Sequence, residues 1–296
     1  MNMWRSRTIA AVVALAGSGA LLVGGAVSSL PDAESKGEIT IAVFNGWDEG
    51  IAAAELWKHA LESEDYTIEL VYADPAAVFT GVAGGSYDLV MNGWLPITHA
   101  SFLETYGDDL VDLGAWNDEA KLTIAVNEDA PIDSLEELAA NADLFGNRLV
   151  GIEAGAGHTK ITADDVIPGY GLGGMDFVTS STPAMLTELQ SATDAGENIA
   201  VTLWRPHWAY NAFPVKDLED PKGLLGEAEG LHTLTSTTFA DEFPEVNAWL
   251  SDFRMDNDLL YSLQDAMFNQ YDGDDYGPVV EDWMAENEDW AGALTR

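Results

Sequence analysis

Three tryptophans stand at or just after the ends of short apolar runs, and their placement is the first sign of chemistry in this sequence. Trp94 and Trp204 each close such a run and precede a proline by two residues, and Trp47 follows a run that ends at Phe44. Tryptophan offers the best aromatic face for a cation. A quaternary ammonium group has no hydrogen-bond donor, so a carboxylate partner would lose hydration with poor compensation. The three side chains therefore predict a site for a quaternary ammonium cation.

Five other tryptophans lack this placement. Large aromatic side chains usually fill the core, and we predict that role for them. They are Trp57, Trp116, Trp249, Trp283 and Trp290.

The elements that must position the site alternate between strand and helix patterns, which indicates βαβ units and a mainly parallel sheet. The first series predicts strands at 38–44, 67–72 and 87–91, and helices at 48–62 and 75–84. The second predicts strands at 122–126, 148–152, 175–178 and 198–203, and helices at 135–142, from the glycine-rich turn through 164, and at 183–192. After Gly230 the pattern predicts helices only, at 243–253, 256–268 and 279–287.

Two series of this kind predict two lobes, with the chain crossing between them near Lys121 and Gly230. Lobe 1 is expected to comprise 38–121 and 231–296, and lobe 2 to comprise 122–230. Ligands of open α/β sheets bind outside the carboxyl ends of strands. The three tryptophans are therefore expected to face one cleft from both lobes.

Composition excludes several classes of partner. The chain has 51 Asp and Glu against 12 Lys and Arg, for a net charge of −39. Nucleic acid and anionic lipid would be repelled, because both need a basic face. The acidic residues near the C-terminus lack the spacing of a calcium loop. They are interpreted as a solvated acidic surface suited to high salt, where counterions screen repulsion.

Residues 1–37 are predicted to be a leader. Arg5 and Arg7 precede an uncharged stretch that ends in small residues, as in an export signal peptide. The stretch is also long enough to anchor the chain if it is not cleaved, and this alternative stays open. The chain has no cysteine, which excludes a lipoprotein anchor and any disulfide. We expect an exported protein, periplasmic or associated with the cell surface.

The sequence gives little support for an enzymatic function. The five histidines, at positions 59, 99, 158, 207 and 232, show no metal-binding spacing, so no metal or other cofactor is expected. His99 with Ser101 and Asp108 could be imagined as a hydrolase triad, but no G-x-S-x-G elbow accompanies them. A sensor domain is a further alternative, which no attached signalling segment supports.

Four segments together resemble the signature segments of glycine betaine-binding proteins of osmoprotectant ABC importers, and in the same order. They are Gly46–Ala52, Gly93–His99, Gly151–Gly157 and Leu203–Trp208. The likeness extends over nearly the whole chain after residue 37. It implies an α/β, two-lobed periplasmic-binding-protein-like (type II) fold with a ligand cleft between the lobes. It also implies a monomer that delivers its ligand to a membrane permease and ATPase.

The resemblance further implies the roles of individual residues. Trp47, Trp94 and Trp204 form a three-tryptophan prism, and the backbone N–H groups of Gly157 and His158 hold the ligand carboxylate with help from the His99 side chain. A helix start after a glycine-rich turn agrees, because helix N-termini attract anions. The side chain of His158 has no role in this scheme.

The choice of ligand stays open among betaines, carnitine and choline. Choline-binding members carry a fourth aromatic near the start of the second lobe, where this chain has Thr123 and Ala125. That difference favours a betaine.

Overall fold

One mixed sheet of nine strands is the centre of the computed structural model, which describes residues 35–273 and 275–296. The strand order is β2-β1-β3-β9-β4-β7-β5-β6, and β8 pairs with β4. The strands are β1 (Glu38–Phe44), β2 (Thr67–Ala73), β3 (Leu89–Leu95), β4 (Leu110–Asn127), β5 (Arg148–Gly151), β6 (Asp176–Thr179), β7 (Ala200–Arg205), β8 (Val215–Asp217) and β9 (Glu229–Ser236). The predicted leader lies almost wholly outside the described residues.

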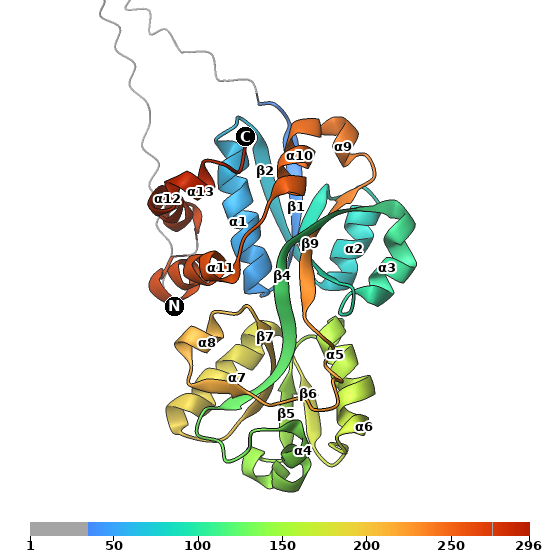
Figure 1. The fold of residues 1–296 in the computed structure, drawn as a ribbon, viewed down its shortest axis with the longest axis vertical. Helices are drawn as coiled ribbons and strands as arrows, with labels where there is room; N and C mark the ends of the chain where they lie inside the picture. Colours follow the sequence, from blue (N-terminus) through green and yellow to red (C-terminus); the bar gives the residue numbers. More distant parts are fainter. Residues whose placement is uncertain (1–34, 274) are drawn as a thin grey trace, which may run out of the picture. The chain divides into compact units, whose positions relative to one another are not determined.

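Helices cover the sheet and connect its parallel strands (Figure 1). They are α1 (Asp48–Glu62), α2 (Pro75–Ala83), α3 (Ala100–Tyr106), α4 (Leu135–Leu138), α5 (Gly157–Ile161), α6 (Ile167–Gly169), α7 (Thr182–Ala195), α8 (Ala209–Ala212), α9 (Phe239–Glu242), α10 (Pro244–Asp252), α11 (Asn257–Gln264), α12 (Gly277–Glu286) and α13 (Glu288–Ala291). Two π-helical turns, Thr162–Val166 and Asp265–Gln270, extend α5 and α11. No helix among these described residues is long and apolar enough to span a membrane.

The sheet has two halves, which we call half-sheet A and half-sheet B. In half-sheet A, β1 pairs in parallel with β2 and β3, and β9 pairs antiparallel with β3 and with the first part of β4. In half-sheet B, β5 pairs in parallel with β6 and β7, and the second part of β4 pairs antiparallel with β7 and β8. Each half therefore carries its own βαβ units.

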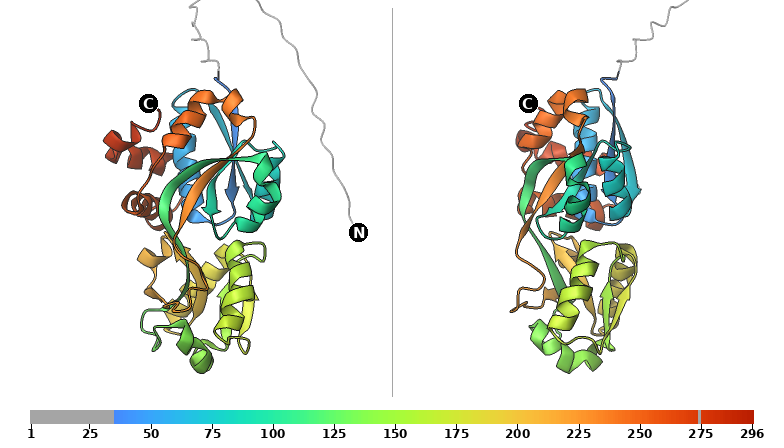
Figure 2. Two further views of the ribbon diagram at one scale, coloured as in Figure 1. Left: turned by 45° about the vertical axis from the view of Figure 1, so that its right-hand side comes forward. Right: turned by 90° about the vertical axis from the view of Figure 1, so that its right-hand side faces the viewer.

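Strand β4 belongs to both halves. Ala120 is still paired with Glu229 of β9, whereas the next residue, Lys121, is paired with Arg205 of β7. The β4 and β9 ribbons run side by side where the chain passes between the halves (Figures 1 and 2). These two strands are the connection that must bend if the halves move.

Local sequence explains the elements that carry the site. Helix α1 is rich in alanine and opens with Asp48 and Glu49, which complement the positive end of the helix dipole. Helix α7 begins at the N-cap Ser181, whose side chain accepts the Ala184 N–H, and ends before Gly196 at φ 66°. All seven residues of β3 are buried, as expected for a strand covered on both faces.

Most predicted elements are confirmed, but two predictions are wrong and some elements were missed. The segment after Gly230 is not purely helical, since β9 occupies 229–236, and the first part of β4 and helix α3 were not predicted. The sheet is not mainly parallel, because β4 and β9 pair only with antiparallel neighbours. Polar residues in both strands weaken the period-2 alternation that predicts a strand. In β4 the register with β9 is also irregular, which weakens the pattern further.

The predicted core tryptophans are confirmed as core residues. Trp57, Trp116 and Trp283 are buried, and Trp249 and Trp290 pack against the same core. The indole of Trp116 donates to the carbonyl of Met91 at 2.6 Å. These rings serve packing.

Candidate functional site

The three tryptophans of the predicted prism lie at the junction of the two half-sheets. Trp47 follows β1, Trp94 is near the end of β3 and Trp204 is near the end of β7, and each is at most 3% exposed. The ring centroids of Trp47 and Trp204 are 5.8 Å apart, with 43° between their planes. Two strand ends separated by more than 150 residues in sequence thus bring their indoles together.

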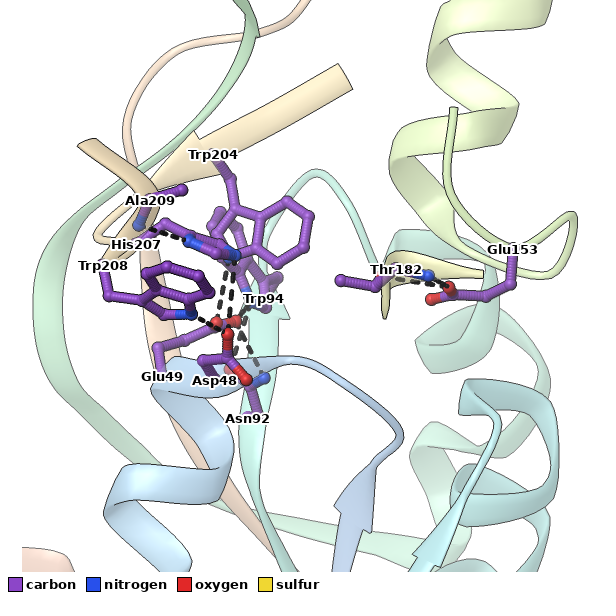
Figure 3. A network of polar contacts seen from close by, with 10 residues as sticks. All are labelled: Asp48, Glu49, Asn92, Trp94, Glu153, Thr182, Trp204, His207, Trp208 and Ala209. Atoms are coloured by element: carbon purple, nitrogen blue, oxygen red, sulfur yellow. Dashed lines mark hydrogen bonds and ion pairs between the residues drawn. The ribbon is translucent and has the colours of Figure 1, made fainter. Parts of the chain in front are cut away.

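The carboxylate of Glu49, in the first turn of α1, links Trp94 to Trp204. Its carboxylate accepts the indole N–H of Trp94 at 3.1 Å and of Trp204 at 2.9 Å, and the Asn92 amide at 2.9 Å (Figure 3). Trp94 also donates to Asn92 Oδ1 at 3.1 Å. Glu49 is fully buried, and this burial raises the pKa of its carboxyl against the effect of the three donors. One carboxylate therefore orients a tryptophan from each half-sheet.

Asp48 forms a second contact across the junction. Its carboxylate accepts the indole N–H of Trp208 and lies 3.8 Å from Nε2 of His207. Burial raises the pKa of Asp48 to about 7, although the Trp208 bond lowers it, and the neighbouring charge of Glu49 raises it further. His207 accepts the Ala209 N–H on Nδ1 at 3.0 Å, and burial lowers the pKa of its imidazole to about 3. Two buried acidic groups, Asp48 and Glu49, therefore lie beside the aromatic rings.

His99 stacks on the tryptophan at the end of β1. The rings of His99 and Trp47 are 5.6 Å apart at 14°. Its Nδ1 accepts the backbone N–H of Trp94 at 3.0 Å, so the neutral ring carries its proton on Nε2. Nε2 is buried without a hydrogen-bond partner among the described residues, and burial lowers the pKa of His99 to about 3. A neutral donor of this kind is suited to a ligand carboxylate.

Gly157 is packed against the turn that carries His99. A Cβ on Gly157 would lie 2.1 Å from the carbonyl oxygen of Thr98, which is closer than atoms can approach, so only glycine fits. The first residue of α5 is thus brought beside His99. Its neighbour His158 is 1% exposed, neither of its ring nitrogens has a partner in the described part of the chain, and burial lowers its pKa to about 3. The His158 side chain joins none of the hydrogen bonds of the site.

A buried acid on β9 holds the same turn. The carboxylate of Glu229 accepts the N–H groups of Ile97 and Thr98, both at 3.0 Å, and the hydroxyl of Thr98. Glu229 therefore connects the turn before His99 to β9, the strand through which the chain re-enters half-sheet A.

Sequence reasoning missed the residues that form hydrogen bonds around the tryptophans and in the turn before His99. They are Asp48, Glu49, Asn92, Glu153, Trp208 and Glu229. The sequence did mark Asp48 and Glu49, because two consecutive acids directly after Trp47 begin an otherwise apolar helix. No local pattern marks the others.

The geometry does not support the imagined hydrolase triad. Nδ1 of His99 is occupied by the Trp94 N–H, so it cannot bind Asp108, and both Ser101 and Asp108 are exposed while His99 is buried. The described residues around His99 therefore do not form a catalytic triad.

Comparison with known proteins agrees with this geometry. The family described as the substrate binding domain of the ABC-type glycine betaine transport system matches residues 37–286. The glycine betaine/carnitine transport binding protein GbuC of Listeria monocytogenes is 31% identical over 162 residues, which are 54% of this chain and 52% of that protein. The match thus spans about half the length of that relative.

Solved structures show the same fold. The glycine betaine/L-proline-binding protein ProX of Borrelia burgdorferi has a TM-score of 0.81 at 27% identity, covering 88% of this chain and 97% of that one. Lactococcal OpuAC, closed on glycine betaine, has a TM-score of 0.79 at 25% identity, covering 88% and 99%. A choline-binding protein in complex with choline shares the fold, with a TM-score of 0.79 at 21% identity, over 87% and 91%.

The family consists of solute-binding components of transporters and not of enzymes, and the α/β fold is that of periplasmic substrate-binding proteins. The chain therefore belongs to the family of substrate-binding domains of ABC-type glycine betaine transport systems.

Proposed function

We propose that this chain captures glycine betaine, or a related quaternary ammonium zwitterion, and delivers it to the permease and ATPase of an ABC importer. The observation that carries the proposal is the gathering of Trp47, Trp94 and Trp204 at one junction beside the buried donor Nε2 of His99. In this scheme the chain acts outside the cytoplasm as a monomer, after export through residues 1–37.

The aromatic faces would hold the trimethylammonium end. Each contact contributes about 0.5–2 kcal/mol when water is excluded. The buried carboxylates of Asp48 and Glu49 add negative potential on that side of the site. The opposite end of the ligand would accept hydrogen bonds from His99 Nε2–H and from the backbone N–H groups of Gly157 and His158 at the start of α5.

Two lobes would close around the ligand. We assign lobe 1 to 38–121 and 231–296 and lobe 2 to 122–230, with the bend at the β4 partner change and at the start of β9. Hydrogen bonds such as Trp204 to Glu49 would then form on closing and break on opening.

Choline is the second candidate, and one observation favours it. Two buried acids beside the tryptophans suit a ligand with a net positive charge better than a zwitterion. Against it, choline offers no carboxylate to the His99 donor.

A calorimetric panel tests the proposal. The purified chain is titrated with glycine betaine, proline betaine, carnitine, choline and glycine at pH 7. Glycine should fail to bind because its ammonium keeps its hydration and fills little of the aromatic site. Replacing Trp94 or Trp204 with Ala should weaken every quaternary ligand by roughly 1–3 kcal/mol.

Trp290→Phe serves as the control because Trp290 packs against the core outside the site. If glycine betaine and choline bind equally, the choline alternative replaces the betaine assignment. Indifference of all quaternary ligands to both Trp→Ala changes would exclude an aromatic cage.

A further inference from the structure

Glu153 lies between β5 and α5, in a segment whose other residues lead to the proposed anion site, and it has no role in the function proposed above. Its Oε1 accepts the indole N–H of Trp47 at 2.5 Å. Its Oε2 accepts the hydroxyl of Thr182 at 3.1 Å and the Thr182 N–H at 3.3 Å (Figure 3). One carboxylate therefore joins the loop after β1 in half-sheet A to the start of α7 in half-sheet B.

The backbones of the two half-sheets also approach closely at this place. A Cβ added to Gly46 would lie 3.0 Å from Pro183 Cδ and 3.3 Å from Thr182 Cβ. The loop that carries Trp47 is thus in van der Waals contact with the first turn of α7. The Trp47–Glu153 hydrogen bond thus lies beside the place where these two segments meet.

Glu153 is itself held in place at the start of a helix. Thr182 is the first residue of the 14-residue helix α7, and its N–H and hydroxyl both donate to Oε2 of Glu153. Oε1 is therefore left to accept the Trp47 indole N–H. Trp47 itself is 3% exposed, so loss of this acceptor would leave a buried N–H without a partner.

We propose that Glu153 is a positioning residue for ligand capture: it fixes the ring of Trp47 over the bound ammonium group as the lobes close, and so slows ligand release. The inference rests on the proposed function. Because Glu153 acts through Trp47 and not through the ligand carboxylate, its removal should affect all quaternary ligands alike. Entry of the ligand occurs in the open form, where this bond is absent, so association should change little.

The experiment measures association and release of glycine betaine and of choline by stopped-flow tryptophan fluorescence on the full chain. Glu153→Ala should raise the release rate of both ligands about tenfold and leave association within about twofold. Glu153→Gln keeps an acceptor oxygen and should restore release to within about threefold of wild type. Glu197→Ala, an exposed acid of half-sheet B, is the matched control and should match wild type.

A double-mutant cycle separates positioning from a general structural effect. Trp47→Phe keeps an aromatic face but lacks the N–H, so adding Glu153→Ala to it should accelerate release little further. Full additivity of the two changes, or wild-type release in Glu153→Ala, would overturn the inference. Melting of each unliganded variant shows whether it is folded, and Glu153→Gln provides the test if the Ala variant is not.

Failure of the two proposals gives different results. If wild type binds no quaternary ligand, the proposed function is wrong and this inference falls with it. If wild type binds them and Glu153→Ala releases them at the wild-type rate, only the role of Glu153 is wrong.

Discussion

The ring Nδ1 of His99 accepts the backbone N–H of Trp94 at 3.0 Å, and the backbone N–H of His99 donates to the carbonyl of Trp94, also at 3.0 Å. The two residues, which are five positions apart in sequence, thus hold each other across one turn. In the proposed scheme Trp94 would contribute an aromatic face to the cation site, and His99 would direct its ring N–H at the opposite end of the ligand. The relative position of the two subsites is set within this turn.

His99→Phe should separate betaines from choline. Phenylalanine keeps a ring to stack on Trp47 but has no N–H for a carboxylate. We expect glycine betaine affinity to fall about tenfold, while choline affinity changes less than about threefold. Calorimetry at pH 7 measures both. Equal losses for the two ligands would show that His99 acts only by packing.

The tautomer of His99 also predicts how betaine binding depends on pH. Burial lowers the pKa of His99 to about 3, so the ring stays neutral, with its proton on Nε2, down to pH 4. Its donor capacity is therefore constant from pH 5 to pH 8. The ratio of wild-type to His99→Phe affinity for glycine betaine should stay flat over that range, and a ratio that changes by more than about threefold would contradict the neutral tautomer.

Asp48→Asn should stabilise the closed form, in which Asp48 is buried against Trp208, and increasingly so as pH rises. The pKa of Asp48 is about 7 in the folded chain against an ordinary value of 3.8, so the folded state holds its proton more tightly than the unfolded state does. Unfolding is therefore favoured as pH rises from about 4 to about 7, by up to about 4 kcal/mol from this group. Asparagine keeps an acceptor for Trp208 without this penalty.

The measurement is the melting temperature of Asp48→Asn minus that of wild type, from pH 4 to pH 8, both at saturating glycine betaine, which keeps the lobes closed in the proposed scheme. This difference cancels the opposite contribution of the buried histidines 99, 158 and 207, whose lowered pKa values reduce stability as pH falls below about 6.5. The difference in melting temperature should be small at pH 4, increase between about pH 4 and pH 7, and level off above pH 7. A difference independent of pH would contradict the raised pKa.

Ligand binding should make the chain more compact. Closure brings Trp47 to Glu153 and Trp204 to Glu49, bonds that link the two half-sheets. Small-angle scattering should give a smaller radius of gyration with saturating glycine betaine than without it. Glycine at the same concentration is the control and should have no effect. An unchanged radius at ligand saturation would argue against hinge closure.

Salt should stabilise the folded chain. With a net charge of −39, self-repulsion disfavours compact states in dilute buffer, and molar salt shortens the screening length to about 3 Å. The melting temperature should rise as NaCl increases from 0.05 M to 1 M. Potassium chloride should act equally if screening is the cause. A flat or falling melting temperature would refute an acidic surface adapted to salt and leave the ligand assignment intact.

Local patterns were sufficient for much of the fold and for the family. β1 and α1 match their predicted bounds, because apolar periodicity and a glycine break are properties of neighbouring residues. The same reasoning assigned Trp57 and Trp116 to the core, where both are buried. β9 was missed because its pairing with β3 and β4 is decided by partners distant in sequence.

The sequence by itself determined which side chains are of a type that could bind a quaternary ammonium ion, and that they lie at or just after strand ends. Tertiary structure alone decided which carboxylate meets which indole. Glu49 and Trp204 are 155 residues apart, and Trp47 and Glu153 are 106 apart, so no local period relates them. The physical reason is burial: an indole N–H removed from water must find an acceptor, and only the folded arrangement of strands determines which acid is within reach.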